Sequence, residues 1–145
     1  MLELDEQWSY VGNKKNQRWL WLAICHSTGQ IMAYCFGKRT DDTFEVLLKT
    51  LQPFKVKYFF SDDWGSYSKY ISERYHEIGK RNTQKIERKF LTFRTRVKRL
   101  GRKSICFSKS EFMHDTVIGL YINTSIESSG GEIYKRQRKT LPNYL

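Results

Sequence analysis

A strongly amphipathic segment, residues 82–100, constrains the fold more than any other part of this chain of 145 residues. Apolar side chains recur there every three or four residues, which is the spacing of one face of an α-helix, and they are Ile86, Phe90, Phe93, Val97 and Leu100. Gly101 follows directly and supplies a C-terminal stop. The segment therefore predicts a long helix that buries one narrow face.

The same part of the chain carries most of the positive charge. The formal net charge of the protein is +11 at pH 7. In residues 80–103 eleven side chains are basic and Glu87 is the only acid, so this window has a net charge of +10 and the remaining residues are nearly balanced at +1. A concentrated positive patch on a folded domain suits the phosphate backbone of nucleic acid, because binding releases condensed counterions. A merely solvated helix face rich in lysine and arginine is the alternative interpretation.

The residues at the start of the chain alternate in the manner of β-strands. Residues 2–11 alternate between two faces, of which one is polar and carries Glu3, Asp5, Gln7 and Ser9. A polar loop is expected over residues 12–17, and residues 18–26 are apolar on both faces, as in a central strand. Residues 31–36 return after a turn, so the three runs predict an antiparallel meander.

A helix and a short strand follow the meander. Asp41 and Asp42 are expected to be N-caps of a helix whose apolar residues recur at helical spacing. Pro53 closes this helix, because proline cannot continue it. A short β-rich run then ends immediately before Asp62.

The remaining elements complete a recognisable order. A helix is predicted over residues 64–74, a brief strand over residues 76–79 and, after the basic helix, a last helix from the capping-box pattern of residues 108–111 to about Ile122. Three antiparallel strands, a helix, a strand, a helix, a short strand and a long helix form the order of an RNase H-like α/β fold. We therefore expect a mixed sheet, in which parallel strands follow three antiparallel strands, with helices on both faces.

Three acidic residues in this order can meet at one place. Asp5 lies on the polar face of the first strand, Asp62 at the carboxyl end of the next parallel strand, and Glu87 at the edge of the apolar stripe of the long helix. The carboxyl ends of strands in α/β sheets face the crevice where ligands bind. Carboxylate oxygens are the ligands that Mg²⁺ takes, and two ions about 4 Å apart can activate water and stabilise the leaving oxygen of a phosphodiester. We expect these three residues to be catalytic and to hold two Mg²⁺ or Mn²⁺ ions.

Seven short motifs, in the right order, resemble the DDE transposases of the insertion-sequence-one family. They are residues 5–12 (DEQWSYVG), 17–20 (QRWL), 36–40 (FGKRT), 61–64 (SDDW), 81–88 (RNTQKIER), 100–104 (LGRKS) and 114–119 (HDTVIG). The resemblance extends from about Asp5 to Ile126. It implies an RNase H-like domain that cuts DNA at a transposon end and then transfers the strand to target DNA. Its acidic residues would be Asp5, Asp62 and Glu87, with 24 residues between the second and the third.

The resemblance also implies DNA-binding residues and partners. Helical geometry places Arg94 and Lys98, seven and eleven residues after Glu87, in line with it, and Arg94 matches a basic residue that such transposases place there. Further DNA contacts are expected at Arg81, Lys85, Arg88, Lys89, Arg102 and Lys103. The expected partners are transposon ends, target DNA, further copies of the chain in the active complex, and an upstream reading-frame product that supplies DNA recognition.

The site residues have competing interpretations. Asp63 is well placed as N-cap of the following helix and competes with Asp62 as metal ligand, but the family commonly has glycine at the position of Asp63. Glu87 could be a solvated partner of Arg94, although seven residues is too far for a routine ion pair within a helix. Asp5 taken alone could be an ordinary exposed strand residue.

Other residue types with chemical potential are expected to be structural. His114 and Asp115 could form an acid–base pair, but a first-turn helix acid beside a structural or DNA-contacting histidine is favoured. Core and sheet packing is expected for Trp8, Trp19, Trp21 and Trp64. No C-x-x-C pair is present, and small apolar fillers of strands are expected at Cys25, Cys35 and Cys106.

We expect one catalytic domain over residues 1–127 and a flexible basic tail over residues 128–145. No run approaches the roughly 20 apolar residues of a membrane span, so a cytoplasmic bacterial protein near the nucleoid is expected. The chain starts four residues before Asp5, so the family's zinc-binding and helix-turn-helix region is expected to be missing. A nuclease that only hydrolyses, and a non-catalytic DNA-binding remnant, are the alternative functions.

Overall fold

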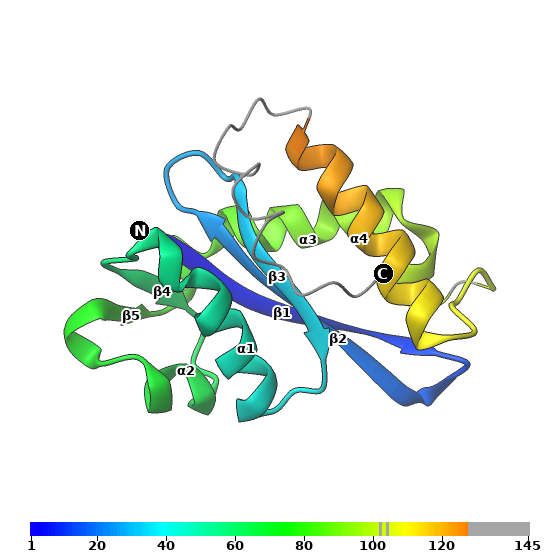
Figure 1. Cartoon of the computed structure of the whole chain (residues 1–145), viewed down its shortest axis with the longest axis horizontal. Helices are drawn as coiled ribbons and strands as arrows, with labels where there is room; N and C mark the ends of the chain where they lie inside the picture. Colours follow the sequence, from blue (N-terminus) through cyan, green and yellow to red (C-terminus); the bar gives the residue numbers. More distant parts are fainter. Residues whose placement is uncertain (102, 104, 128–145) are drawn as a thin grey trace.

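The computed structural model describes residues 1–101, 103 and 105–127, and it confirms the expected α/β class (Figure 1). The sheet has the strand order β3-β2-β1-β4-β5 and consists of β1 (Leu2–Val11), β2 (Asn13–Cys25), β3 (Ile31–Gly37), β4 (Phe59–Ser61) and β5 (His76–Ile78). The first three strands pair antiparallel, whereas β4 runs parallel to β1 and β5 runs parallel to β4. This mixed sheet of RNase H-like order places β1 at its centre.

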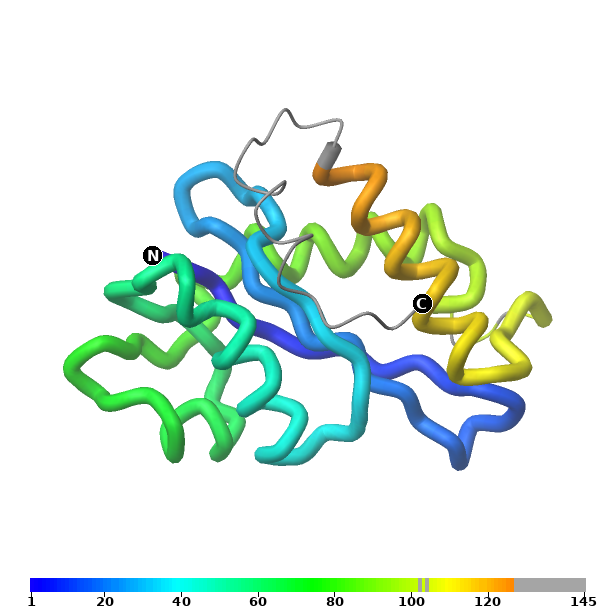
Figure 2. Tube along the Cα trace, in the orientation of Figure 1, coloured from blue at the N-terminus to red at the C-terminus, as the bar shows by residue number. Residues whose placement is uncertain are grey.

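Helices cover both faces of the sheet, as expected (Figures 1 and 2). One face packs against α1 (Asp41–Leu51) and α2 (Gly65–Tyr70), and the core between them includes Trp21, Phe44, Leu47 and Tyr67. The other face packs against α3 (Gln84–Arg96) and α4 (Glu111–Glu127), and that core includes Ile86, Phe90, Phe93 and Ile118. The amphipathic stripe of the basic segment is therefore the face that α3 turns toward the sheet.

The alternation along β1 sorts its side chains between the two layers. Leu2 and Leu4 belong to the core beneath α1 and α2. Glu3 accepts a hydrogen bond from the first turn of α3, and Ser9 contacts the α4 residue His114, so this parity faces α3 and α4. Asp5 has the same parity as Glu3 and Ser9 and lies between them, which directs its carboxyl group to the α3 side of the sheet.

The connection between β1 and β2 is much tighter than the loop expected over residues 12–17. Val11 pairs with Asn13 across Gly12, whose φ of 77° lies in the left-handed region that glycine adopts without strain. Strand β2 therefore begins at Asn13, and the side chains of residues 13–17 are exposed along the protruding hairpin. Polarity there reflects solvent exposure of a strand.

Two of the predicted helices are shorter than expected because the backbone becomes extended after each. Helix α2 ends at Tyr70, since Ile71 has φ −114° and ψ 123°, and a separate 3₁₀ turn follows at Glu73–Tyr75. Helix α3 ends at Arg96, since Val97 has φ −107° and ψ 98°, and Lys98–Leu100 forms another 3₁₀ turn. The buried side chains of Val97 and Leu100 hold this bend against the core.

The start of α1 differs from the expected aspartate caps. Thr40 occupies the N-cap position, and Asp41 and Asp42 lie in the first turn, where negative charge is favourable. The carboxyl group of Asp41 is engaged by Ser66 and Lys69 of α2. Asp41 therefore links two helices and leaves the α1 backbone without a side-chain cap.

The start of α4 also differs, by two residues. The Met113 backbone N–H donates to Oγ of Ser110 at 3.2 Å, so Ser110 is the capping residue where the pattern suggested Ser108. Ser108 instead forms an isolated parallel bridge with Val11, and its hydroxyl lies 2.6 Å from Nδ1 of His114. Ser108, the first serine of the capping-box pattern, thus makes tertiary contacts and does not cap the helix.

Some expectations fall outside what the structure describes. The tail expected over residues 128–145 and the DNA-binding role expected of Arg102 lie outside the described residues. Within the part of the chain that is described, every helix is too short or too polar to cross a membrane.

Candidate active site

Asp5 and Asp62 belong to neighbouring parallel strands. Leu2 pairs with Phe59 and Glu3 with Phe60, and the same register continued by two residues places Asp62 beside Asp5. Asp62 directly follows the last residue of β4, and its Oδ1 accepts a hydrogen bond from the backbone N–H of Trp64 at 3.1 Å. This local turn fixes the Asp62 carboxyl group at the carboxyl end of β4, where ligands bind in α/β sheets.

The competing acid, Asp63, lies in a different environment. Asp63 is exposed, whereas Asp62 is half-buried. Trp64 occupies the N-cap position of α2, and no side chain caps this helix. The capping role considered for Asp63 is therefore wrong, and Asp62 is the acid whose charge acts on Asp5.

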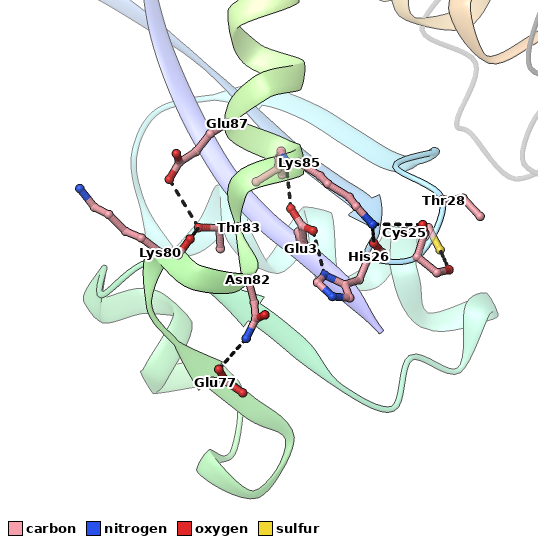
Figure 3. Close-up of polar contacts among 12 residues, drawn as sticks. Glu3, Cys25, His26, Thr28, Glu77, Lys80, Asn82, Thr83, Lys85 and Glu87 are labelled. Carbon is pink, nitrogen blue, oxygen red and sulfur yellow. Dashed lines mark hydrogen bonds and ion pairs between the residues drawn. The ribbon is translucent and has the colours of Figure 1, made fainter.

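Glu87 approaches from the first turn of α3. Its backbone N–H donates to the carbonyl oxygen of Thr83 at 3.1 Å, and its Oε1 lies 3.5 Å from the Thr83 hydroxyl (Figure 3). The Glu87 side chain is exposed and stands next to Ile86, which is fully buried in the core. The edge position expected for Glu87 on the apolar stripe is confirmed.

The electrostatics of Asp5 report that the three acids share one neighbourhood. The pKa of Asp5 is raised to about 7, first because the carboxyl group is buried, and then because the negative charge of Glu6 repels its ionised form. A hydrogen bond from the Glu6 backbone N–H, 2.8 Å from Oδ1, opposes this shift, and the charges of Asp62 and Glu87 add to it. Asp62 and Glu87 are therefore both near enough to Asp5 for their charges to act on its carboxyl group.

The donor set has the chemistry of a divalent-cation site, but the side chains do not converge on one point. In residues 1–101, 103 and 105–127, no three Asp, Glu, His or Cys side chains stand close enough together to hold one metal ion. A cation would offset the repulsion that raises the pKa of Asp5. The amide of Gln7, buried two residues after Asp5 on the same face, has no hydrogen-bond partner among the described residues. These features fit hard, oxygen-liganded ions.

Asp5 is expected to destabilise the metal-free protein. Its pKa of about 7 exceeds the ordinary 3.8, so the native state binds more protons than the unfolded state between these values, and stability falls as pH rises across this window. Asp5→Asn removes the buried charge and should raise the free energy of unfolding at pH 8 by about 1–2 kcal/mol. Urea unfolding in the presence of a chelator measures this. An equal gain in the exposed control Asp63→Asn would contradict the explanation.

Sequence reasoning missed a buried ion pair on the opposite face of β1. Glu6 is 8% exposed, and its Oε1 accepts from Arg39 Nε at 2.9 Å, while Tyr67 donates to its other oxygen. The Arg39 guanidinium lies 5.0 Å from the ring centroids of both Trp19 and Trp64. The sequence did contain a signal for this pair: Glu6 is an acid on the otherwise apolar face of β1, and a buried acid needs a partner.

The second missed residue is Glu3. It is 1% exposed and lies two residues before Asp5 on the same face of β1. Its Oε1 is 2.8 Å from Nδ1 of His26, and its Oε2 accepts from the backbone N–H of Ile86 at 2.9 Å (Figure 3). The sequence placed Glu3 on the polar face of β1 but gave no indication that α3 would cover that face.

His114 and Asp115 do not form an acid–base pair. His114 is completely buried between the hydroxyls of Ser9 and Ser108, and burial lowers its pKa to about 4. Asp115 accepts two hydrogen bonds from the Arg18 guanidinium, at 3.1 and 2.6 Å. The structural interpretation of His114 is confirmed, because complete burial leaves it no surface for DNA.

The expected DNA-binding residues lie in three different settings. Exposed cations near α3 include Arg81, Arg88, Arg94 and Lys103, and Lys89 is half-buried. Lys85 is exposed, but its ammonium group donates to the carbonyl oxygens of His26 and Ser27. The expectation that Lys98 continues the line from Glu87 to Arg94 is wrong, because the helix ends before it.

Lys98 instead lines a basic cavity of about 390 Å³ at the carboxyl end of α3. Its wall is formed by Arg96, Val97, Lys98, Arg99, Cys106, Val117 and Tyr121. Glu87 and Arg96 are nine residues apart in α3, which corresponds to about 14 Å along the helix axis. The expectation that Cys106 is a filler of a strand is wrong, because Cys106 is exposed and lies outside the strands. Cys25 and Cys35 do lie in strands, β2 and β3.

These features define an RNase H-like α/β protein that gathers acids at the centre of its sheet beside a strongly basic helix. Residues 1–127 match the family model described as IS1 transposase, and the chain belongs to this family.

Individual relatives agree with the family match. The chain is 54% identical over 120 residues to the insertion element iso-IS1n protein InsB of Shigella dysenteriae, covering 83% of this chain and 92% of the relative. It is 46% identical over 121 residues to the IS1 protein InsB of Shigella sonnei, with 83% and 92% covered. An IS1 protein InsB of Escherichia coli K12 also matches at 46%, with 83% of this chain and 72% of the relative covered.

Proposed function

We propose that this chain is a DNA transposase that cuts a DNA strand and joins the freed end to a second DNA. The observation that carries this proposal is that Asp62 and Glu87 both lie near enough to the buried carboxyl group of Asp5 for their charges to act on it, adding to the larger effects of burial and of Glu6 on its pKa. Carboxyl groups that lie close together repel one another and thereby lower the stability of the protein. Such an arrangement is typical of a functional site, and binding of divalent cations is a function that requires it. Membership of the IS1 transposase family supports the same reaction.

In the proposed mechanism Asp5, Asp62 and Glu87 would hold two Mg²⁺ or Mn²⁺ ions. When bound, these ions supply activation of the attacking oxygen and stabilisation of the leaving oxygen in an in-line phosphoryl transfer. Asp5 must release its proton to act as a ligand. Asp62 accepts from the Trp64 backbone N–H through Oδ1, and its second oxygen would be the metal ligand. Glu87 would join them as a ligand from the first turn of α3.

The basic surface gives the DNA a path away from the acids. Arg88 and Arg94 are exposed on α3, and the cavity with Arg96, Lys98 and Arg99 follows at the end of that helix. Cations spaced along about 14 Å of the helix can contact several successive phosphates of one DNA strand. We therefore place the DNA backbone along α3, from the carboxyl groups to the cavity.

Charge reversal at the cavity is expected to weaken DNA binding. Arg96→Glu combined with Lys98→Glu should lower affinity for duplex DNA at least about tenfold and reduce the salt slope by about 2, because two phosphate contacts are lost. Fluorescence anisotropy across a range of KCl concentrations measures both quantities. The matched control is Lys49→Glu with Lys57→Glu, which makes the same change in charge at exposed positions away from the cavity. Equal losses in both double variants would contradict a localised DNA path.

A strand-transfer assay tests the function directly. The full chain is incubated with a duplex oligonucleotide carrying an insertion-element end, a target plasmid, and Mg²⁺, Mn²⁺ or no divalent cation. Cation-dependent joining of the oligonucleotide to the plasmid supports the proposal. Cutting without joining would assign a nuclease instead, and DNA binding without cutting would assign a non-catalytic DNA-binding protein.

A further inference from the structure

The start of α3 lacks a cap from its own sequence. Thr83 occupies the N-cap position with φ −115° and ψ 11°, and its side chain accepts no capping hydrogen bond from the backbone of the first turn. The first backbone N–H groups of a helix have no partner within the helix and need one from elsewhere. One of these donors belongs to Ile86, the third residue of α3, whose side chain is fully buried.

Glu3 supplies the missing partner from a different part of the chain. Its Oε2 accepts from the Ile86 N–H at 2.9 Å, across 83 positions of sequence, and its carboxyl group stands where the helix dipole favours negative charge. Its Oε1 lies 2.8 Å from Nδ1 of His26, in the turn after β2. Both oxygens are thus engaged, and the side chain is 1% exposed, so little freedom of movement remains.

A second contact ties the same turn to the helix. The Lys85 ammonium group donates to the carbonyl oxygen of Ser27 at 3.1 Å and to that of His26 (Figure 3). Figure 3 shows Glu3 and His26 beside the start of α3, with the Glu87 side chain projecting from the same first turn of the helix. The sheet and the helix are therefore joined by hydrogen bonds directly beside Glu87.

We infer that Glu3 is a positioning residue that sets Glu87 against Asp5. Glu3 and Asp5 project from the same face of β1, two residues apart, while Ile86 directly precedes Glu87 on α3. The bond from Glu3 to the Ile86 N–H therefore fixes the distance between the strand that carries one proposed metal ligand and the helix that carries another. The inference rests on the proposed function, because it concerns the geometry of that same site.

Three substitutions in the full chain separate positioning from simple stability. Glu3→Ala removes the cap, whereas Glu3→Gln keeps an oxygen that can accept from the Ile86 N–H and an amide that can contact His26. Leu51→Ala is the destabilised control, since Leu51 is 2% exposed in the core on the opposite face of the sheet. Three quantities are measured for each variant: the Mn²⁺ affinity without DNA, by electron paramagnetic resonance, the rate of DNA cleavage, and the hydrogen exchange of the backbone amides of residues 84–87.

Glu3→Ala is expected to bind Mn²⁺ about tenfold more weakly, as is typical when a group that orients metal ligands is lost. Its cleavage kcat should fall by a similar factor with the KM for DNA unchanged, and amides 84–87 should exchange faster. Glu3→Gln should restore both affinity and kcat to within about threefold of the unmodified protein. Leu51→Ala should leave Mn²⁺ affinity unchanged.

The inference is overturned if Glu3→Ala binds Mn²⁺ like the unmodified protein, if Glu3→Gln is as impaired as Glu3→Ala, or if Leu51→Ala weakens Mn²⁺ binding equally. A different result overturns the proposed function itself. That result is an unmodified protein that binds no Mn²⁺, or that binds Mn²⁺ equally well after Asp5→Asn. The positioning role is then overturned together with the proposed function.

Discussion

Asp62→Asn is expected to lower the rate of cation-dependent strand cleavage by a factor on the order of 10³ or more. An amide lacks the negative charge that attracts a divalent cation, and one ligand of the proposed site is lost. DNA affinity should be unchanged, because the expected phosphate contacts lie on the basic surface of α3. Cleavage is measured under single-turnover conditions, which separate the chemical step from DNA binding.

The adjacent acid provides a matched control for this change. Asp63→Asn alters the same charge by the same chemistry one residue further along, at an exposed position. It should retain cleavage within about twofold, as surface substitutions commonly do. Glu87→Gln should reproduce the loss seen with Asp62→Asn. If instead Asp63→Asn removes cleavage and Asp62→Asn does not, the assignment of the second acid is wrong.

The sequence could predict those parts of the fold in which apolar and polar residues repeat every two residues, as in a strand, or every three to four residues, as in a helix. The alternation of Glu3, Asp5 and Gln7 gave the correct face of β1, because consecutive side chains of a strand must point to opposite sides. The spacing from Ile86 to Phe93 gave the buried face of α3 for the equivalent reason in a helix. The proximity of Asp5, Asp62 and Glu87 could be predicted because the element order alone brings a strand, the end of its parallel neighbour and a helix together; their role as catalytic residues stays a prediction.

Tertiary contacts decided what sequence could not predict. Val97 leaves the helical conformation with its side chain buried in the core, and this moves Lys98 from the line of Arg94 into the basic cavity. Nothing in the local sequence distinguishes Val97 from the other residues of the apolar stripe. Ser108 matched a capping pattern, but its bridge to Val11 and its contact with His114 place it before the helix.

The two faces of β1 show how much of the site depends on such contacts. Glu3 is held by Ile86 and His26 on one face, and Glu6 by Arg39 and Tyr67 on the other. Asp5 lies between them, and its pKa is raised first by burial and then by the negative charge of Glu6. Both neighbouring acids of β1 are engaged by side-chain or backbone partners within the fold, and this contrast fits the proposed role of Asp5 as a metal ligand.

The buried His114 is expected to make the protein sensitive to acid. Its pKa of about 4 lies below the ordinary 6.5, first because burial disfavours the charged ring; Asp115 opposes this shift, and Arg18 and Arg99 add to it. The hydroxyls of Ser9 and Ser108 can bond to either protonation state: one accepts from and the other donates to the neutral ring, whereas both accept from the charged ring. Lowering the pH from 6.5 to 4 protonates the unfolded state first, so native stability falls across this window by about 2–3 kcal/mol.

Asp5 acts in the opposite direction over an overlapping range of pH, since its pKa is raised to about 7, so the measurement is made in an Asp5→Asn background. There, the free energy of unfolding is followed by urea titration from pH 7 to pH 4. His114→Gln is the comparison, because glutamine can bond to both serines but does not titrate. The histidine protein should lose about 2–3 kcal/mol more than the glutamine variant between these two pH values. Parallel stability profiles would show that protonation of His114 does not govern the response of this fold to acid.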